Sequence, residues 1–207
     1  AEEADPSDFM FYAVLGLSIF FFTGVTIATV YFVIKYRARP GHKAQPSPSH
    51  NDTLEITWTV IPTIICVFLF LGGWRGYLAF TAERGGALQI DVTGQKWAWS
   101  FTYPNGTVDN NLHVPVGQPV RLRMTSTDVL HSFYVPNFRV KQDLVPRRYT
   151  YLQFTPTRPG VYRLYCTEYC GKDHSMMKVR VIVHETGGYE RYLATVEERS
   201  ATLPPVE

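Results

Sequence analysis

Two long apolar segments open the chain. Residues 9–34 are 26 consecutive positions without Asp, Glu, Lys or Arg, and residues 56–74 are 19 more. A helix needs about 20 apolar residues to cross the roughly 30 Å hydrocarbon core of a membrane. Core helices of soluble domains, the alternative, rarely stay uncharged on every face over such a length. The pattern predicts a transmembrane helical hairpin within residues 1–80, with spans at about 9–36 and 55–79.

Charge in the short connecting loop predicts the orientation of this hairpin. Four basic residues lie there, and acids come only at its far end, at Asp52 and Glu55. Loops enriched in Lys and Arg stay on the cytoplasmic side. We therefore expect an integral protein of a bacterial inner membrane, with both termini and everything after about residue 80 on the periplasmic side. The basic residues are Lys35, Arg37, Arg39 and Lys43.

The remainder of the chain has the pattern of an all-β domain. Short runs rich in β-branched and aromatic residues alternate with turn signals such as Pro104-Asn105-Gly106. Many short strands at near-regular spacing are typical of a sandwich or barrel. We expect this domain at residues 81–186, with a short terminal helix and a tail at 187–207, and we see no basic nucleic-acid patch. The expected strands are Leu88–Thr93, Trp97–Thr102, Val120–Ser126, Tyr149–Phe154, Val161–Cys166 and Lys178–Val183.

One loop carries the candidate chemistry. Within twelve residues it holds Cys166, Cys170, His174 and Met177. Thiolate, imidazole and thioether are soft or borderline ligands, and this set favours copper. A mononuclear blue-copper site uses a single Cys, whereas two cysteines can bridge two metal ions. Each ion then needs one imidazole and one weak ligand besides the shared sulfurs.

The remaining ligands must come partly from elsewhere in the chain. His131 follows a predicted strand and is the candidate for the second imidazole. Met177 would be the weak ligand of one copper, and the backbone carbonyl of Glu168, between the cysteines, that of the other. A structural disulfide between the two cysteines and a zinc site remain alternatives. Zinc would leave Met177 without a role.

The order of several segments resembles one known family. Together they are similar to the signature segments of cytochrome c oxidase subunit II, over about residues 10–200. The loop also resembles that of nitrous oxide reductases, but the two spans favour the oxidase; quinol oxidase subunits share the architecture and lack the ligands. The resemblance implies a cupredoxin-like Greek-key barrel after the two helices. The segments are Leu54–Pro62, Trp97–Phe101, Asp128–Phe133, Val140–Asp143 and Cys166–Met177.

The resemblance also implies a function shared with other subunits. A binuclear copper A centre would accept electrons from cytochrome c and pass them to haem in subunit I, where oxygen reduction and proton pumping occur. The implied ligands match residue by residue. They are His131, Cys166, the carbonyl of Glu168, Cys170, His174 and Met177.

Three further roles follow from the same resemblance. The Glu168 side chain matches a ligand of a magnesium ion shared with subunit I, Trp97 the electron-entry tryptophan, and Glu55 the acid at the mouth of a proton path. The ordinary alternatives are a solvated loop acid, a core or edge aromatic, and an interfacial acid. Two rival functions stay open for the chain: a tethered domain that only transfers electrons, and a copper-delivery or structural module.

Charge raises a question about the electron donor. Residues 81–207 hold 15 Lys and Arg against 12 Asp and Glu, whereas better-known members of the family offer an acidic patch to a basic cytochrome c. A basic domain attracts such a donor weakly. We therefore expect a cytochrome c that is fused beyond the Pro-containing tail at 201–207, or held beside the oxidase in a supercomplex.

Overall fold

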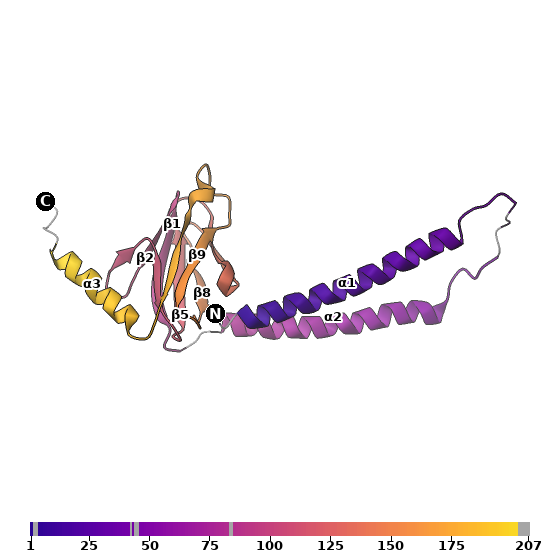
Figure 1. Ribbon diagram of the computed structural model, residues 1–207, viewed down its shortest axis with the longest axis horizontal. Coiled ribbons are helices and arrows are strands. Elements are labelled where there is room, and N and C mark those ends of the chain that lie inside the picture. Colours follow the sequence, from indigo (N-terminus) through magenta and orange to yellow (C-terminus); the bar gives the residue numbers. More distant parts are fainter. Residues whose placement is uncertain (2–3, 42, 44–45, 83–84, 203–207) are drawn as a thin grey trace. The chain divides into compact units, whose positions relative to one another are not determined.

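The computed structural model describes residues 1, 4–41, 43, 46–82 and 85–202 (Figure 1). The chain forms two compact units: Asp8–Leu78, and Ala79–Glu207 with Ala1–Ser7. The expected tail at Leu203-Pro204-Pro205 lies outside the described residues.

Two long helices make up the N-terminal region. Helix α1 spans Ala4–Lys35 and α2 spans Asp52–Thr81. Both contain a stretch long and apolar enough to cross a membrane, and none of that stretch is buried inside the protein. Apolar side chains exposed all round a helix of about 45 Å, at 1.5 Å per residue, suit lipid rather than water. The prediction of two apolar helices is confirmed, with ends a few residues from those expected.

The second unit is a sandwich of two five-stranded sheets followed by helix α3 (Gly188–Thr202), which confirms the predicted fold class. One sheet has the order β3-β2-β1-β5-β8, with β1 and β5 parallel; the other has the order β4-β10-β9-β6-β7. The strands are β1 Leu88–Gln95, β2 Ala98–Thr102, β3 Val108–Asp109, β4 Leu112–Pro115, β5 Val120–Ser126, β6 His131–Val135, β7 Val140–Leu144, β8 Thr150–Phe154, β9 Gly160–Cys166 and β10 Lys178–His184.

The core lies between the sheets and is filled by inward-facing residues of the strands, which alternate most clearly in β5. In β5, Val120, Leu122 and Met124 are fully buried, whereas Arg121 and Arg123 lie on the outer face. Each fully buried large apolar side chain contributes about 1.5–3 kcal/mol. All six expected strands are present. Strands β3, β4, β6 and β7 were not expected, and β6 begins at His131 itself.

Helix α3 packs on β4 through aromatic side chains. Tyr192 stacks on the imidazole of His113 with ring centroids 3.8 Å apart, and its hydroxyl donates to Asp109 Oδ2 at 2.8 Å. His113 Nδ1 lies 2.9 Å from Nε2 of His184, at the end of β10. A pair of histidines thus lies under the terminal helix, and the ring that accepts in this hydrogen bond cannot gain a proton at that nitrogen without losing the bond.

We expect this histidine pair to make stability depend on pH. Burial lowers the pKa of His113 from 6.5 to about 4; Asp109 opposes this shift and His184 adds to it. The folded protein therefore binds the proton less readily than the unfolded chain, and stability present above pH 6.5 falls as the pH approaches 4. After allowance for solvent screening the loss is on the order of 1–2 kcal/mol.

Thermal unfolding of the copper-free chain in detergent, followed between pH 7 and pH 5, measures this effect. His113→Gln should flatten the dependence. His50→Gln, a change in the exposed loop between the helices, should leave it as in wild type. An unchanged slope in His113→Gln would rule out the histidine pair as the source.

Candidate metal centre

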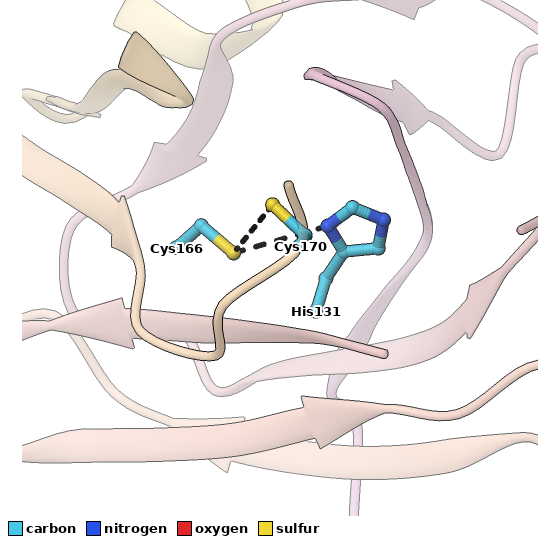
Figure 2. Close-up of side chains that lie close together, drawn as sticks. All are labelled: His131, Cys166 and Cys170. Carbon is cyan, nitrogen blue, oxygen red and sulfur yellow. Dashed lines mark hydrogen bonds between the residues drawn. The ribbon is translucent and has the colours of Figure 1, made fainter. Parts of the chain in front are cut away.

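The centre is built where two neighbouring strands of one sheet meet the loop that follows. Strand β9 ends at Cys166 and pairs with β6, which begins at His131. Figure 2 shows both side chains converging with Cys170. Cys166 Sγ lies 3.8 Å from Cys170 Sγ and 3.8 Å from His131 Nδ1. One donor atom of each residue lies within 4.8 Å of the others, and all three side chains are buried.

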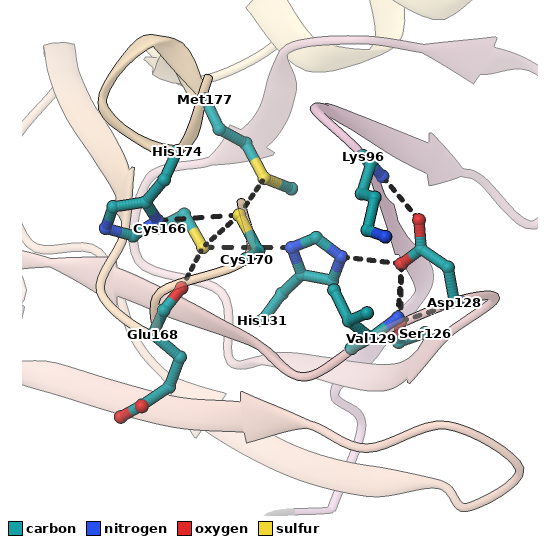
Figure 3. A network of polar contacts seen from close by, with 10 residues as sticks. All are labelled: Lys96, Ser126, Asp128, Val129, His131, Cys166, Glu168, Cys170, His174 and Met177. Carbon is teal, nitrogen blue, oxygen red and sulfur yellow. Dashed lines mark hydrogen bonds and ion pairs between the residues drawn. The ribbon is translucent and has the colours of Figure 1, made fainter. Parts of the chain in front are cut away.

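The loop adds three more donors to this cluster (Figure 3). His174 Nδ1 lies 3.4 Å from Cys170 Sγ, and Met177 Sδ lies 3.8 Å from the same sulfur. The backbone carbonyl of Glu168 accepts from the Cys166 thiol at 3.3 Å. The structure therefore brings together all the sulfur, nitrogen and carbonyl donors that the sequence predicts for one centre.

A carboxylate behind His131 fixes the orientation of the imidazole. Asp128 Oδ1 lies 2.9 Å from Nε2, so Nε2 carries the proton and Nδ1 presents its lone pair to the sulfurs. Burial alone would raise the pKa of Asp128. Hydrogen bonds from His131 and from the backbone N–H groups of Lys96 and Val129 instead lower it to about 2.

Two glycines make room for two rings at the centre, the imidazole of His131 and the indole of Trp97. A Cβ on Gly94 would lie 3.3 Å from the His131 ring and 3.2 Å from Leu144, so a larger residue would press on the imidazole. Gly171 has a positive φ of 124°, and a Cβ there would lie 3.3 Å from the indole of Trp97. The Trp97 ring thus lies against the loop while the side chain stays 36% exposed.

The donor set fits copper better than the alternatives. Both cysteines of the loop are free thiols. Burial and the neighbouring Cys166 raise the pKa of the Cys170 thiol to about 11, so a strongly binding cation is needed to hold its thiolate at neutral pH. A closed tetrahedral zinc site uses four ligands and would leave the thioether of Met177 without a role. Soft ligands and a weak thioether favour copper.

The Glu168 carboxylate points away from the sulfurs (Figure 3). Its Oε1 lies 3.1 Å from the ammonium of Lys141, which also lies 3.3 Å from Asp143 Oδ1. A carboxylate is a suitable magnesium ligand, but among the described residues its immediate partner is a cation. A role of Glu168 as a magnesium ligand therefore stays a prediction.

Glu55 lies in the first turn of α2, in the other compact unit. Its Oε1 accepts a hydrogen bond from the backbone N–H of Asn51 at 3.1 Å, and the Asn51 side chain accepts from Leu54 N–H at 3.1 Å. This is reciprocal capping of a helix start. Glu55 therefore has a structural role besides the one that the resemblance implies.

Sequence reasoning gave no role to two residues that support the centre. Asp128 lies in the segment Asp128–Phe133, three residues before His131, and this spacing was the available signal. Trp99 is buried; its Nε1–H donates to the Met177 carbonyl at 3.4 Å, and its ring lies edge-to-face with His131. Nothing in the sequence distinguishes this contact from ordinary core packing.

Fold and site together define a class: a β-sandwich domain with a cluster of soft metal-binding donors, preceded by two helices able to span a membrane. Two family models match the chain. The transmembrane domain of cytochrome c oxidase subunit II matches residues 4–73, and its periplasmic domain matches residues 105–184. The chain belongs to the cytochrome c oxidase subunit II family. It is therefore a membrane protein whose sandwich domain lies outside the cytoplasm.

Individual relatives agree with this placement. Cytochrome c oxidase subunit 2 of Alkalihalophilus pseudofirmus is 34% identical over 92% of this chain, which spans 60% of the relative. The corresponding protein of Thermostichus vulcanus is 32% identical over 93% of the chain and 75% of its own length.

Solved structures support the cupredoxin-like fold of the second unit. The periplasmic domain of subunit II from Bradyrhizobium japonicum superposes with a TM-score of 0.51 at 33% identity, over 54% of this chain and 94% of that one. A subunit II domain in a mixed-disulfide intermediate with a thioredoxin-like protein gives a TM-score of 0.50 at 29% identity, over 57% and 96%.

Proposed function

We propose that this chain is the electron-entry subunit of a haem–copper oxidase: it accepts electrons from a cytochrome c at a binuclear copper A centre and passes them to haem in subunit I. Oxygen reduction and proton translocation then belong to the assembled enzyme. The single observation that carries the proposal is the convergence of two thiols, two imidazoles, one thioether and one carbonyl.

Each residue has a distinct part in this function. The copper pair, when bound, supplies a one-electron carrier. Cys166 and Cys170 would hold both ions through shared thiolates, His131 and His174 would provide one imidazole each, and Met177 with the Glu168 carbonyl would be the weak ligands. Asp128 holds the His131 ring, which limits reorganisation when the charge at the centre changes.

Metal analysis of the purified chain, with its electron paramagnetic resonance spectrum, tests the proposal. We expect two coppers per chain that share one delocalised unpaired electron when oxidised. A four-line spectrum typical of a single copper, or stoichiometric zinc, would contradict the proposal. Co-purification with a haem-bearing subunit separates an oxidase from a domain that only transfers electrons.

Met177→Leu should keep both coppers and shift the reduction potential. The side chain is 2% exposed and its sulfur lies 3.8 Å from Cys170 Sγ, so leucine fills nearly the same space without offering a ligand. Met176→Leu is the matched control, because Met176 is 64% exposed. Redox titration followed by absorbance measures the shift. Complete copper loss in both variants would overturn the assignment of Met177.

Glu55→Gln should leave copper reduction intact and slow turnover of the whole oxidase, if Glu55 stands at the mouth of a proton path. The amide oxygen of glutamine can still accept from the Asn51 N–H, so the helix start is preserved. Asp52→Asn removes a neighbouring charge from the same turn as a control. Unchanged oxygen consumption in Glu55→Gln would leave this residue only its capping role.

We also propose, from the family resemblance, a magnesium site and an electron donor. Glu168 would contribute one carboxylate to a magnesium ion at the boundary with subunit I. The ammonium of Lys141 would then have to move away from that carboxylate. The donor would be a cytochrome c fused to the chain or held in a supercomplex. A tethered donor acts through high effective concentration, so its oxidation rate should depend weakly on salt.

A further inference from the structure

The outer face of the sheet β4-β10-β9-β6-β7 carries three neighbouring positive charges, those of Arg163, Lys178 and Arg180. Leu164 and Val181 point into the core, so alternation places Arg163 of β9 and Arg180 of β10 on the outer face. The register makes these two arginines direct cross-strand partners. Both are exposed. Two guanidinium groups therefore face solvent side by side in the middle of the sheet.

The neighbouring positions extend this face. Lys178 of β10 is paired with Tyr165 of β9, and Tyr165 is paired with Tyr134 of β6. On the opposite flank of the arginines, Val161 is paired with Ile182 and is 66% exposed. The basic face is defined here as Tyr134, Val161, Arg163, Tyr165, Lys178, Arg180 and Ile182.

Two other cations on the sandwich have anionic partners, unlike this pair of arginines. On the opposite sheet Arg123 forms an ion pair with Asp91, and on β7 Lys141 lies between Asp143 and Glu168. Within the part of the chain that the structure describes, Arg163 and Arg180 form no ion pair. Like charges directly opposite each other in a sheet are destabilising. Among the described residues, no anion offsets this repulsion through an ion pair.

We propose that the basic face is a docking surface for a carboxylate-bearing patch on another protein subunit of the oxidase. The inference rests on the proposed function, in which the chain is part of a multisubunit enzyme. Guanidinium groups bind carboxylates in a bidentate manner, and two adjacent arginines suit a patch with more than one acid. Tyrosine and arginine are enriched in protein interfaces, and the exposed Val161 adds apolar area that a phosphate headgroup would not use.

Arginine labelling with phenylglyoxal, quantified by mass spectrometry, tests this surface. Three samples are compared: the assembled oxidase purified through a tag on this chain, the chain alone in detergent, and the chain alone in phosphatidylglycerol vesicles. Arg158, exposed in the loop before β9, is the internal control. We expect a several-fold drop in labelling of Arg163 and Arg180 in the assembled oxidase alone, with Arg158 labelled equally in all three.

The other outcomes contradict the inference. Equal labelling of both arginines in the oxidase and in the isolated chain would show that no subunit covers the face. Protection in the vesicles without other subunits would assign the face to lipid. Absence of haem from the tagged preparation would refute the proposed function itself and the docking surface with it, and the haem absorbance reports this separately from the labelling.

Charge reversal gives a second readout. The double variant R163E and R180E should release at least one other subunit of the oxidase at a lower salt concentration than wild type during washing of the tagged complex. R158E should behave as wild type. Copper content, which the outer face does not touch, should stay unchanged in both variants, so a loss of subunit cannot be attributed to a damaged centre. Release at the wild-type salt concentration would overturn the proposal.

Discussion

Cys166→Ser or Cys170→Ser should each abolish the two-copper centre and leave at most one copper per chain. Both sulfurs lie within reach of the other donors, 3.8 Å apart, so each is expected to be shared by two ions. A serine hydroxyl is a hard and weakly acidic group that does not replace a bridging thiolate. The change in volume is small, and the sandwich should keep its fold. Copper analysis and the paramagnetic spectrum measure the loss.

Cys66→Ser is the matched control for these substitutions. Cys66 lies in α2, in the other compact unit, and is exposed there. Its replacement should leave the copper content and the spectrum of wild type. Two coppers and an unchanged spectrum in either Cys166→Ser or Cys170→Ser would show that the centre does not depend on shared sulfurs.

Trp97→Phe should slow reduction by cytochrome c on the order of tenfold or more, which corresponds to a barrier increase of about 1.4 kcal/mol. The indole lies against the loop at Gly171 and is 36% exposed, so it offers a contact between a docked donor and the centre. Phenylalanine is smaller and should not fill this place. Because Trp97 contributes no ligand, the copper spectrum should stay unchanged.

Stopped-flow reduction with two reductants separates electron entry from damage to the centre. Dithionite, a small reductant, should reduce Trp97→Phe and wild type at equal rates. Cytochrome c should reduce Trp97→Phe more slowly than wild type. Tyr151→Phe, a change to another exposed aromatic on the outer face of β8, should match wild type with both. Equal cytochrome c rates in Trp97→Phe and wild type would remove Trp97 from the path.

Periodicity was sufficient to predict the long strand β5, because buried and partly exposed residues alternate over its seven positions. It was insufficient for β3, which has only two residues, and for β4, whose four residues include His113 and Pro115. These segments become strands only because neighbours supply the hydrogen bonds. Tertiary pairing of this kind leaves no local pattern in the sequence.

The sequence spacing of the ligands was enough to predict the loop of the site. Contacts that depend on how strands and turns bring side chains together could not be predicted. The loop from Cys166 to Met177 could be interpreted from the sequence alone, and His131 from its position after a strand. The hydrogen bond from His131 to Asp128 and the direct pairing of Arg163 with Arg180 became visible only with the structure. Both depend on side-chain direction across a turn or a strand pair.

The donor loop is closed at its base, and this has a consequence for metal exchange. The N–H of Cys166 donates to the Met177 carbonyl at 3.2 Å, so the first and last residues of the loop are joined before β10 begins. Strand β10 is then held between β9 and β4. Opening the base of the loop breaks this hydrogen bond, which directly adjoins the pairing of β9 with β10. A bound ion should therefore leave on the timescale of partial unfolding, and its residence time should follow the kinetic stability of the sandwich.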